Sequence, residues 1–549
     1  MTFSGLDRGK ILEKMSEQEL DLLIIGGGIT GAGIALDSSL RGMNVGLVEM
    51  QDFASGTSSR STKLVHGGLR YLKNLDFKIV AEVGKERAIV YENAPHVTSP
   101  EKMILPFYKG GTFGKFSTSL GLKMYDFLAG VKKSERRYML SREQTLQKEP
   151  LLKKDGLAGS GIYVEYKTDD ARLTLETLKK AVEKGAKAVN YSKAEQFLYQ
   201  NNRLSGVVVK DLINNKEYNI YAKKIVSATG PWVDNLRRLD NSLKEKHLLL
   251  TKGTHLIFDQ KRFPLIHAIY FDTHDKRMVF AIPREGKTYL GTTDTFYDGD
   301  LVNPRMTVAD RNYLLSAANN MFPTLKLTAG DIESSWAGIR ALIHTEGKAP
   351  SEISRRDEIF ISDSGLISIA GGKLTGYRIM AAKIVDLVVS QLKKKEGIVF
   401  KPCQTRETPL SGGDVDGSAG FKAFIIEKIK EGQNLGLSEE EAENLIKRYG
   451  SNINHLYKII KETNGEKLSG LPKDIYAALK FGLDNEMVVT PLDFFHRRTG
   501  ALLFNRDWVV KWKDKVIDFM AEYYSWEEDK KEKYQTELEK ELKYTVTPV

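Results

Sequence analysis

Short apolar runs, a glycine-rich turn and helical spacing follow one another along the first fifty residues. Residues 22–25 are consecutive apolar residues, which is typical of a strand buried in a parallel sheet. The glycine-rich turn and a stretch of helical spacing come next, and residues 45–48 form a second apolar run that ends at Glu49. The pattern predicts a strand, a helix and a second strand, preceded by a short amphipathic helix over residues 1–20.

The turn after the first strand has the spacing Gly26-x-Gly28-x-x-Gly31. In a dinucleotide-binding unit the first glycine makes the tight turn, the second admits a diphosphate to the backbone, and the third lets helix and strand pack closely. The diphosphate then lies on the N–H groups at the positive end of the helix. Glu49 follows at roughly the 20-residue distance where an acidic side chain binds the ribose hydroxyls. A tight turn without a ligand is the alternative, but the strand, the helix and the acid together favour a dinucleotide.

A loop dense in hydroxyl residues and glycine extends from Asp52 to Leu72. Such a backbone can lie against a large flat ligand, because its hydroxyl and amide groups donate to phosphate and ring oxygens. A solvated serine and threonine loop is the alternative, but basic and aromatic residues are interspersed along it. Helical spacing then covers 75–95 and ends at Pro95.

Further strands are predicted between residues 161 and 229. Those at 161–165, 188–198 and 204–209 precede a buried strand at 225–229, which leads into Gly230. Gly230 is therefore a second place where the backbone can approach the dinucleotide.

Alternating patterns at 248–258 and 278–293 predict an antiparallel sheet, which we interpret as part of a substrate-binding region. An apolar run at 367–370 is followed by a second glycine-to-helix transition over 371–375. Proline and glycine over 402–420 indicate a linker, and helical patterns follow it.

These elements predict an α/β fold in three parts, because 549 residues are too many for one core. A discontinuous Rossmann-like nucleotide-binding domain is predicted over residues 1–400. An antiparallel-sheet substrate region is inserted into it at roughly 90–160 and 240–335, and an all-α C-terminal domain is predicted over 401–549.

Composition restricts the class of protein. Hydrophobic residues make up 41% of the chain and charged residues 28%, as in soluble globular proteins. No run of eighteen apolar residues is present, and the mixed charges of residues 1–20 exclude a secretory signal, so we expect a cytoplasmic protein. The single cysteine, Cys403, excludes an internal disulfide and any cysteine-rich metal or iron–sulfur site.

The net charge of +10 indicates attraction to nucleic acid, to anionic lipid headgroups or to a phosphorylated substrate. Composition alone leaves these three open. From 105 to 133, aromatic residues and glycine alternate with lysine, which suits either a segment lying in a membrane interface or ordinary packing.

Seven motifs lie in order along the chain: GGGITGAG, TSSRSTKLVHGGLRYL, SATGPWVD, KGTHLIF, IPREGKTYLGTTDT, WAGIR and ISIAGGKLTGYR. Together with Glu49 they resemble the FAD-dependent glycerol-3-phosphate dehydrogenases, flavoproteins similar in fold to the D-amino-acid oxidase group. The resemblance covers nearly the whole chain. It implies FAD, oxidation of sn-glycerol 3-phosphate to dihydroxyacetone phosphate, and transfer of the electrons to a membrane quinone. We assume that the FAD is noncovalent, with covalent attachment at His66 as the alternative. The implied partners are this substrate, the quinone and the cytoplasmic membrane surface, with peripheral association; a homodimer is a candidate assembly, and no nucleic acid is expected.

The resemblance assigns several segments to FAD. The glycine-rich turn and Glu49 match the contacts to the diphosphate and ribose, part of the hydroxyl-rich loop runs beside the flavin, and the second glycine loop lies near the pyrimidine edge of the flavin. With Gly230 added, the candidate cofactor-binding residues are Gly26, Gly28, Gly31, Glu49, Thr57, Ser58, Lys63, His66, Gly230, Gly371, Gly372 and Leu374.

The residues matched on the substrate side are Arg70, Tyr71, His255, Arg340, Arg355, Lys373 and Thr375. A phosphate dianion favours forked guanidinium donors, which Arg70, Arg340 and Arg355 provide. Hydride leaves C2 only as the C2 hydroxyl loses its proton, so a base or a strong cation is needed there. His255 has a suitable pKa and is our candidate base, with Arg340 and Lys373 orienting the substrate and stabilising charge. A packed arginine at 340 and a surface ion pair at Arg355 are the alternatives.

Two departures from the family pattern bear on these assignments. Arg284 follows Ile282-Pro283 where the family often has a bulkier apolar or aromatic residue, which puts the local packing in doubt. The relatives that reduce oxygen carry a sizeable extra segment in the middle of the chain, and its absence here favours a dehydrogenase. The competing hypotheses are a flavin oxidase that releases hydrogen peroxide and a nucleotide-sensing module that contacts RNA through its charge.

Overall fold

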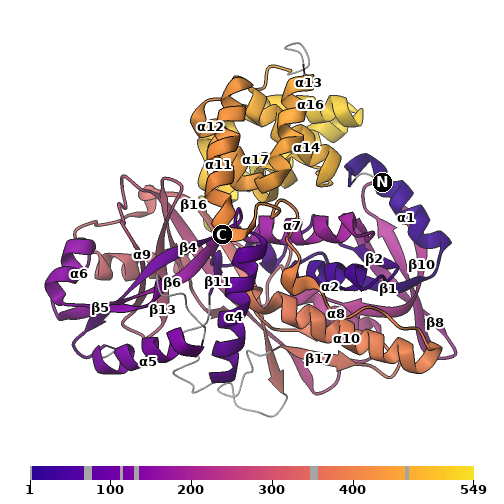
Figure 1. The fold of residues 1–549 in the computed structure, drawn as a ribbon, viewed down its shortest axis with the longest axis horizontal. Coiled ribbons are helices and arrows are strands. Elements are labelled where there is room, and N and C mark those ends of the chain that lie inside the picture. The colour runs from indigo at the N-terminus through magenta and orange to yellow at the C-terminus, as the bar shows by residue number, and fades with distance from the viewer. Residues whose placement is uncertain (1–2, 67–76, 112–114, 129–134, 346–356, 464–468) are drawn as a thin grey trace.

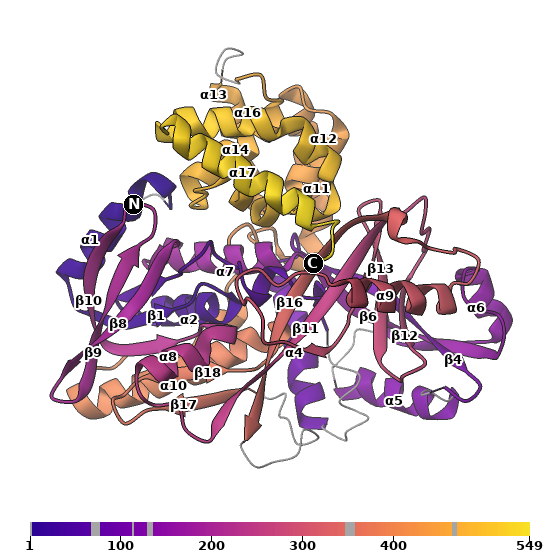
Figure 2. The ribbon, with the colours of Figure 1, turned by 180° about the vertical axis from the view of Figure 1, so that it is seen from behind.

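The structure is a computed structural model, and it describes residues 3–66, 77–111, 115–128, 135–345, 357–463 and 469–549. Two sheets lie next to each other, and helices from the C-terminal part of the chain sit across their junction (Figures 1 and 2). The C-terminus lies near this junction. The predicted fold class, an α/β nucleotide-binding part with an antiparallel substrate sheet and an all-α C-terminal part, is confirmed.

The first sheet has a parallel centre. Its strands are β1 (Leu20–Ile25), β2 (Val45–Val48), β7 (Lys187–Val189), β8 (Ser192–Gln200), β9 (Arg203–Asp211), β10 (Lys216–Ser227), β17 (Glu358–Ile361) and β18 (Ile367–Ala370). The order is β17-β18-β10-β1-β2-β7, and the β8–β9 hairpin is attached to β10. The single strand predicted at 188–198 is two strands, because the chain turns at Tyr191, whose φ is 49°.

Helices bury the parallel strands. The helix α2 (Ile29–Leu40) packs against both α7 (Asp170–Glu183) and α10 (Tyr377–Glu396). Leu22, Leu23 and Ile24 of β1 are fully buried, which explains why this strand is an unbroken apolar run.

The second sheet is antiparallel apart from the parallel pairing of β4 and β12. Its strands are β3 (Leu64–Val65), β4 (Thr98–Tyr108), β5 (Tyr138–Leu140), β6 (Leu157–Thr168), β11 (Lys246–Asp259), β12 (Ala268–Asp272), β13 (Met278–Arg284), β14 (Lys287–Gly291), β15 (Thr295–Phe296) and β16 (Ile332–Thr345). The order is β15-β11-β14-β13-β12-β4-β6-β3, with β16 paired to β11 and β5 to β6. Since β16 also contacts β18, the β11–β16 pair lies at the border between the two sheets.

Further helices flank the sheets: α1 (Arg8–Glu17), α4 (Phe77–Asn93), α5 (Lys115–Leu128), α6 (Arg142–Lys148), α8 (Val233–Leu239) and α9 (Val308–Met321). The basic-aromatic stretch 105–133 contributes to β4 and α5. Phe107 and Tyr125 are each 1% exposed, so these two aromatic side chains pack against the substrate sheet. In the described part of the chain, no helix has the length and apolar character needed to cross a bilayer.

The C-terminal helices enclose a hydrophobic core of their own. They are α11 (Gly417–Asn434), α12 (Glu439–Tyr449), α13 (Ile453–Glu462), α14 (Lys473–Asn485), a π-helix (Asp493–Arg498), α15 (Ala501–Phe504), α16 (Arg506–Tyr524) and α17 (Glu528–Tyr544). The linker predicted over 402–420 ends earlier, because α11 already begins at Gly417. The exact domain boundaries stay a prediction.

A buried ionic cluster joins the C-terminal helices to the loop after β2. Asp52 is 1% exposed and accepts hydrogen bonds from Arg497 Nε (2.5 Å), Arg498 Nη1 (2.5 Å), Arg498 Nη2 (2.8 Å) and Asn190 Nδ2 (2.9 Å). Burial acts to raise the pKa of Asp52, but the charges of Arg498 and Arg497 outweigh it and hold the pKa at about 2. The position of this loop therefore depends on two arginines of the C-terminal helices.

Asp52→Ala should destabilise the protein by about 3–5 kcal/mol, because it leaves two buried guanidinium groups without this counter-charge. The stabilisation is complete above the ordinary carboxyl pKa of 3.8 and is lost as the pH falls towards 2. Urea unfolding should therefore separate wild type from variant clearly at pH 5 and less at pH 3. An equal separation at both pH values would exclude the ion pairs as its source.

Candidate active site

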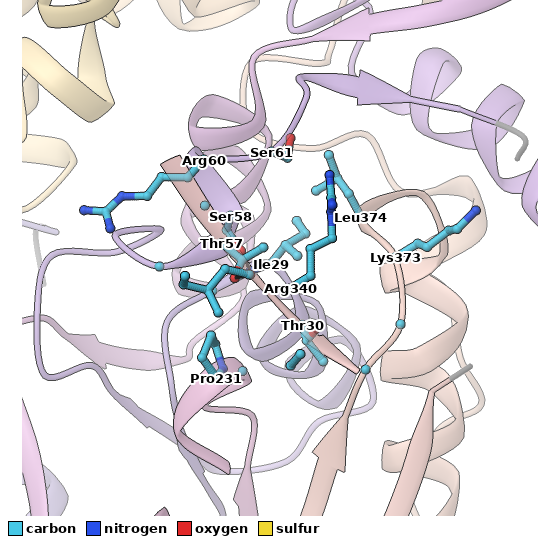
Figure 3. A pocket seen from close by; sticks show the side chains of 18 of the residues that line it. Ile29, Thr30, Thr57, Ser58, Arg60, Ser61, Pro231, Arg340, Lys373 and Leu374 are labelled. Atoms are coloured by element: carbon cyan, nitrogen blue, oxygen red, sulfur yellow. Dashed lines mark hydrogen bonds between the residues drawn. The ribbon is translucent and has the colours of Figure 1, made fainter. Parts of the chain in front are cut away.

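A cavity of about 800 Å3 lies between the two sheets (Figure 3). Its walls come from the carboxyl ends of β1, β2, β10 and β18, and from β11 and β16. The carboxyl ends of parallel strands are where open α/β sheets bind ligands, and this volume suits a large organic cofactor.

The glycine-rich turn forms one end of the cavity. Gly26 and Gly28 line the cavity, and Gly31 lies behind them in α2. A Cβ on Gly31 would lie 1.9 Å from the carbonyl oxygen of Gly26, so only glycine allows this helix and turn to pack together. Ser58 Oγ accepts a hydrogen bond from Ile29 N (2.9 Å). The first turn of α2 also supplies N–H groups and a positive dipole end to a diphosphate.

Glu49 lines the cavity beside this turn. Its Oε2 accepts a hydrogen bond from Gly27 N (2.7 Å), and its Oε1 accepts one from Gln51 N (2.8 Å). Burial raises the pKa of Glu49, and these two hydrogen bonds partly offset the rise. Each carboxylate oxygen retains further acceptor capacity, so this fixed side chain can still bind ribose hydroxyls.

The segment from Thr57 to His66 passes between the two sheets. Thr57 Oγ1 donates to the carbonyl of Ile339 on β16 (2.7 Å). Lys63 does not have the flavin-side position that the resemblance implied: it does not line the cavity, and its Nζ lies 2.6 Å from Asp170 Oδ1. A buried ammonium group needs a counter-charge, so Lys63 anchors the segment from behind.

The second glycine loop forms the opposite wall. Gly371 and Gly372 have φ values of 73° and 88°, and both line the cavity together with Leu374. Thr375 Oγ1 binds both the backbone N–H and the carbonyl of His66, each at 3.1 Å. Thr375 thus ties the loop to the Thr57–His66 segment, and its predicted contact with substrate stays a prediction.

The β11–β16 pair presents two of the candidate side chains, His255 and Arg340, on one face. His255 lies opposite Trp336, Gly253 opposite Gly338, and Arg340 opposite Thr251, and such alternate positions share a face. A Cβ on Gly253 would lie 3.0 Å from Arg340 Nη2, so the guanidinium folds back over this glycine. The Cα atoms of Gly253 and His255 are about 7 Å apart along the strand. Guanidinium and imidazole are therefore close neighbours.

The guanidinium of Arg340 is held in place by the residues that follow β14. Nη1 lies 3.0 Å from Asp294 Oδ1 and donates to the carbonyl of Thr293 (3.3 Å), while Nη2 donates to Thr292 Oγ1 (3.3 Å). Its side chain is 35% exposed. It is therefore oriented and still accessible to a ligand.

His255 is only 1% exposed, and its ring stacks on Trp336 with centroids 4.4 Å apart and an angle of 6°. Nε2 lies 3.1 Å from Thr62 Oγ1, and Nδ1 is buried. Burial, with the charges of Arg340 and Lys63, holds the pKa of His255 well below its ordinary value of 6.5. The imidazole is therefore neutral at neutral pH.

The structure brings most of the predicted residues together around this cavity. Lys373 and Arg340 both line it, but their side chains extend in different directions (Figure 3). Arg70, Tyr71 and Arg355 lie outside the described residues. The predicted residues that line the cavity are Gly26, Gly28, Glu49, Thr57, Ser58, His66, Gly230, His255, Arg340, Gly371, Gly372, Lys373, Leu374 and Thr375.

Sequence reasoning did not single out Thr62, Asp294, Tyr289 or Trp336. Two of these had a usable signal. Trp336 is separated from Arg340 by an even number of residues, so both must face the same side of β16. Asp294 directly follows two threonines at the end of a β-strand pattern, a common position for a functional side chain.

Comparisons with known protein families agree with this geometry. A family described as FAD dependent oxidoreductase matches residues 21–378, and one described as C-terminal domain of alpha-glycerophosphate oxidase matches residues 403–531. Over 548 residues the chain is 60% identical to an aerobic glycerol-3-phosphate dehydrogenase of Bacillus subtilis (strain 168), covering 100% of this chain and 99% of that one. An enzyme of the same name from Staphylococcus aureus (strain USA300) is 57% identical over 545 residues, covering 99% and 98%.

Solved structures agree as well. The glycerol-3-phosphate dehydrogenase from Bacillus halodurans, complexed with FAD, superposes with a TM-score of 0.87 at 53% identity and covers 100% of this chain and 99% of that one. The L-alpha-glycerophosphate oxidase from Mycoplasma pneumoniae, with FAD bound, has a TM-score of 0.56 at 18% identity and covers 71% of this chain and 98% of that one. The second likeness shows the fold alone.

The chain belongs to the FAD-dependent oxidoreductase family. Within that family it groups with the aerobic glycerol-3-phosphate dehydrogenases, to which it is similar over its full length, so the resemblance drawn from the motifs is confirmed. Its cofactor is FAD. The residues present fit this cofactor. The close packing at Gly31 places the start of α2 beside Glu49, and the same cavity is lined by Glu49 and by His255.

Gly31→Ala should abolish FAD retention, because the added methyl group collides with the Gly26 carbonyl and forces α2 away from the turn. The ratio of flavin to protein absorbance after purification measures this. Gly9→Ala is a matched control in α1, where nothing lies within 4 Å of the added Cβ. It should keep full flavin and gain about 0.5–1 kcal/mol of stability. Full flavin in Gly31→Ala would disprove the packing argument.

Proposed function

We propose that this chain oxidises sn-glycerol 3-phosphate to dihydroxyacetone phosphate, with FAD as the hydride acceptor and a membrane quinone as the final electron acceptor. One observation carries the proposal: the guanidinium of Arg340 on β16, folded over Gly253, and the neutral imidazole of His255 on β11 lie on the same face of the β11–β16 pair in the wall of the cavity. The names of the full-length relatives support the choice of substrate.

Arg340 is the proposed phosphate ligand. Its forked N–H groups contact Asp294, Thr293 and Thr292. A phosphate dianion carries more charge and more acceptor oxygens than these groups, so it can replace them at the guanidinium. A phosphate on Arg340 leaves the carbon chain of the substrate near His255, because the two side chains lie on the same face of the β11–β16 pair. Arg70 and Arg355 stay predicted further ligands.

His255 is the proposed base, acting through Nε2. Its lowered pKa keeps the ring neutral. In the tautomer with the proton on Nδ1, the lone pair of Nε2, which faces Thr62 Oγ1 in this structure, can accept the proton of the C2 hydroxyl, while stacking on Trp336 fixes the ring. The charge of Arg340 stabilises the developing alkoxide, and Lys373 is proposed to do so as well. When bound, FAD supplies the acceptor for the hydride that leaves C2.

A membrane quinone is the proposed acceptor of the electrons, and the enzyme is proposed to associate peripherally with the membrane surface. The net charge of +10 supports peripheral attraction to anionic headgroups. A flavin oxidase is the second candidate, because the family that matches residues 403–531 takes its description from an alpha-glycerophosphate oxidase. The full-length relatives are named as dehydrogenases, which favours the first. The candidate homodimer stays a prediction.

Anaerobic addition of substrate to the purified holoenzyme tests this function. Glycerol 3-phosphate should bleach the flavin absorbance and glycerol should not. Bleaching by neither compound would disprove the proposed function. Equal bleaching by both would disprove the proposed recognition of the phosphate by Arg340. A quinone with anionic vesicles should then reoxidise the flavin. Rapid peroxide release in quinone-free buffer would select the oxidase.

Arg340→Ala should lower kcat/KM for glycerol 3-phosphate about a hundredfold, which corresponds to about 3 kcal/mol for lost charge-assisted hydrogen bonds. FAD content should stay at the wild-type value, because the guanidinium contacts residues of the substrate sheet. Steady-state kinetics and the flavin ratio provide the two measurements. Loss of flavin in this variant would mean that Arg340 is structural.

His255→Gln should slow flavin reduction about 10²- to 10⁴-fold at saturating substrate. In the wild type the rate should stay level from pH 8 to pH 6, because the pKa of His255 lies well below 6.5 and the ring is already neutral. The rate should fall only at lower pH, as the ring becomes protonated. Anaerobic stopped-flow measurements across this range show it, and an inflection near pH 7 would contradict the assignment.

A further inference from the structure

One side chain of the C-terminal helices forms part of the packing behind His255. Phe504, the last residue of α15, is 7% exposed and belongs to a core cluster of the substrate sheet. Its ring centroid lies 6.0 Å from Trp336 and 6.1 Å from Tyr289. Since Trp336 stacks on His255, a single layer of aromatic rings separates the candidate base from the C-terminal helices.

The same aromatic residues hold the backbone beside the cavity. Trp336 Nε1 donates to the carbonyl of Ser61 (3.1 Å), and the Tyr289 hydroxyl donates to the carbonyl of Thr62 (3.0 Å). Ser61 and Thr62 both line the cavity, and Thr62 Oγ1 also contacts His255 Nε2. Moving Trp336 or Tyr289 would therefore shift both the imidazole and the segment that faces the flavin.

Phe504 is firmly seated against this layer. Ser334 Oγ of β16 donates to the carbonyl of Leu503 (2.5 Å), which fixes the end of α15 on the strand that carries Trp336. The guanidinium of Arg284 lies 4.8 Å from the Phe504 ring centre and donates to the carbonyl of Thr168 (3.0 Å). Arg284 thus packs on the helical domain.

We propose that Phe504 is a positioning residue for the oxidation, and that the C-terminal helices act on the reaction by holding Trp336, and through it His255, from behind. The proposal rests on the proposed function. Removing the ring would leave a void next to Trp336, into which the stack can relax. A displacement of about 1 Å at a reacting group can cost about a hundredfold in rate, so even a small relaxation is measurable.

Phe504→Ala in the full-length holoenzyme tests this. We expect at least a tenfold fall in kcat, with KM for glycerol 3-phosphate and the flavin ratio within twofold of wild type. Phe504→Leu should restore most of the rate because it refills the void. The matched control is Phe519→Ala, a partly buried α16 residue that contacts Tyr476 and Tyr523. It should keep kcat within twofold.

A second measurement separates positioning from stability. The titratable groups that act on His255 are Arg340 and Lys63, and Tyr289 lies beside its ring. In Phe504→Ala the His255 ring should titrate closer to the ordinary histidine value, as seen by NMR of isotope-labelled histidine assigned with His255→Gln. The histidine titration does not depend on whether the wild type oxidises glycerol 3-phosphate. A failure of the proposed function would be seen separately, as an absence of flavin bleaching when glycerol 3-phosphate is added to the wild type.

Three outcomes would overturn the positioning role. The first is an unchanged kcat and histidine titration in Phe504→Ala. The second is an equal loss of kcat in Phe504→Ala and Phe519→Ala. If Phe504→Ala does not fold, Phe504→Val, which also leaves a void beside Trp336, takes its place. A wild-type kcat together with an unshifted His255 titration in Phe504→Val is the third.

Discussion

The active site depends on a close approach between two backbones. The Thr57–His66 segment crosses β16 at Gly338, where a Cβ would lie 2.3 Å from the carbonyl oxygen of Arg60. Gly253, directly opposite on β11, leaves the space into which the Arg340 guanidinium folds. This pair of glycines forms a slot between the nucleotide-binding and substrate sheets. A side chain at either position would separate the Thr57–His66 segment, which lines the cavity, from the residues proposed to bind and activate the substrate.

The chemistry proposed for His255 follows from burial as much as from residue type. In water an imidazole is partly protonated near neutral pH, but here burial and two nearby cations keep it neutral. Stacking on Trp336 and the contact with Thr62 fix its orientation at the same time. Arg340, by contrast, stays accessible because its side chain is 35% exposed, as is that of its partner Asp294. The site thus combines a buried base with an accessible anion ligand.

The features that could be predicted from sequence are those with local determinants. The spacing of Gly26, Gly28 and Gly31, followed by Glu49, defines a turn, a helix and an acid within thirty residues, and the structure has them as expected. The environment of Lys63 was not predictable, because its partner Asp170 is 107 residues away and nothing near Lys63 indicates a buried carboxylate. Arg284 is similar: the ring it stacks on, that of Phe504, belongs to the C-terminal helices. The predictions failed where the environment of a residue is set by partners that are distant in the sequence.

The attachment of Asp52 to Arg498 spans 446 residues of sequence. At ribosomal rates of 5–20 residues per second, about 20 to 90 s pass between the synthesis of these two residues. During this interval the loop after β2, part of which lines the cofactor cavity, lacks the cations that hold it. We therefore expect the nascent chain to acquire its flavin only after release from the ribosome, when the last helices can dock, which makes cofactor loading a late checkpoint in the maturation of this enzyme.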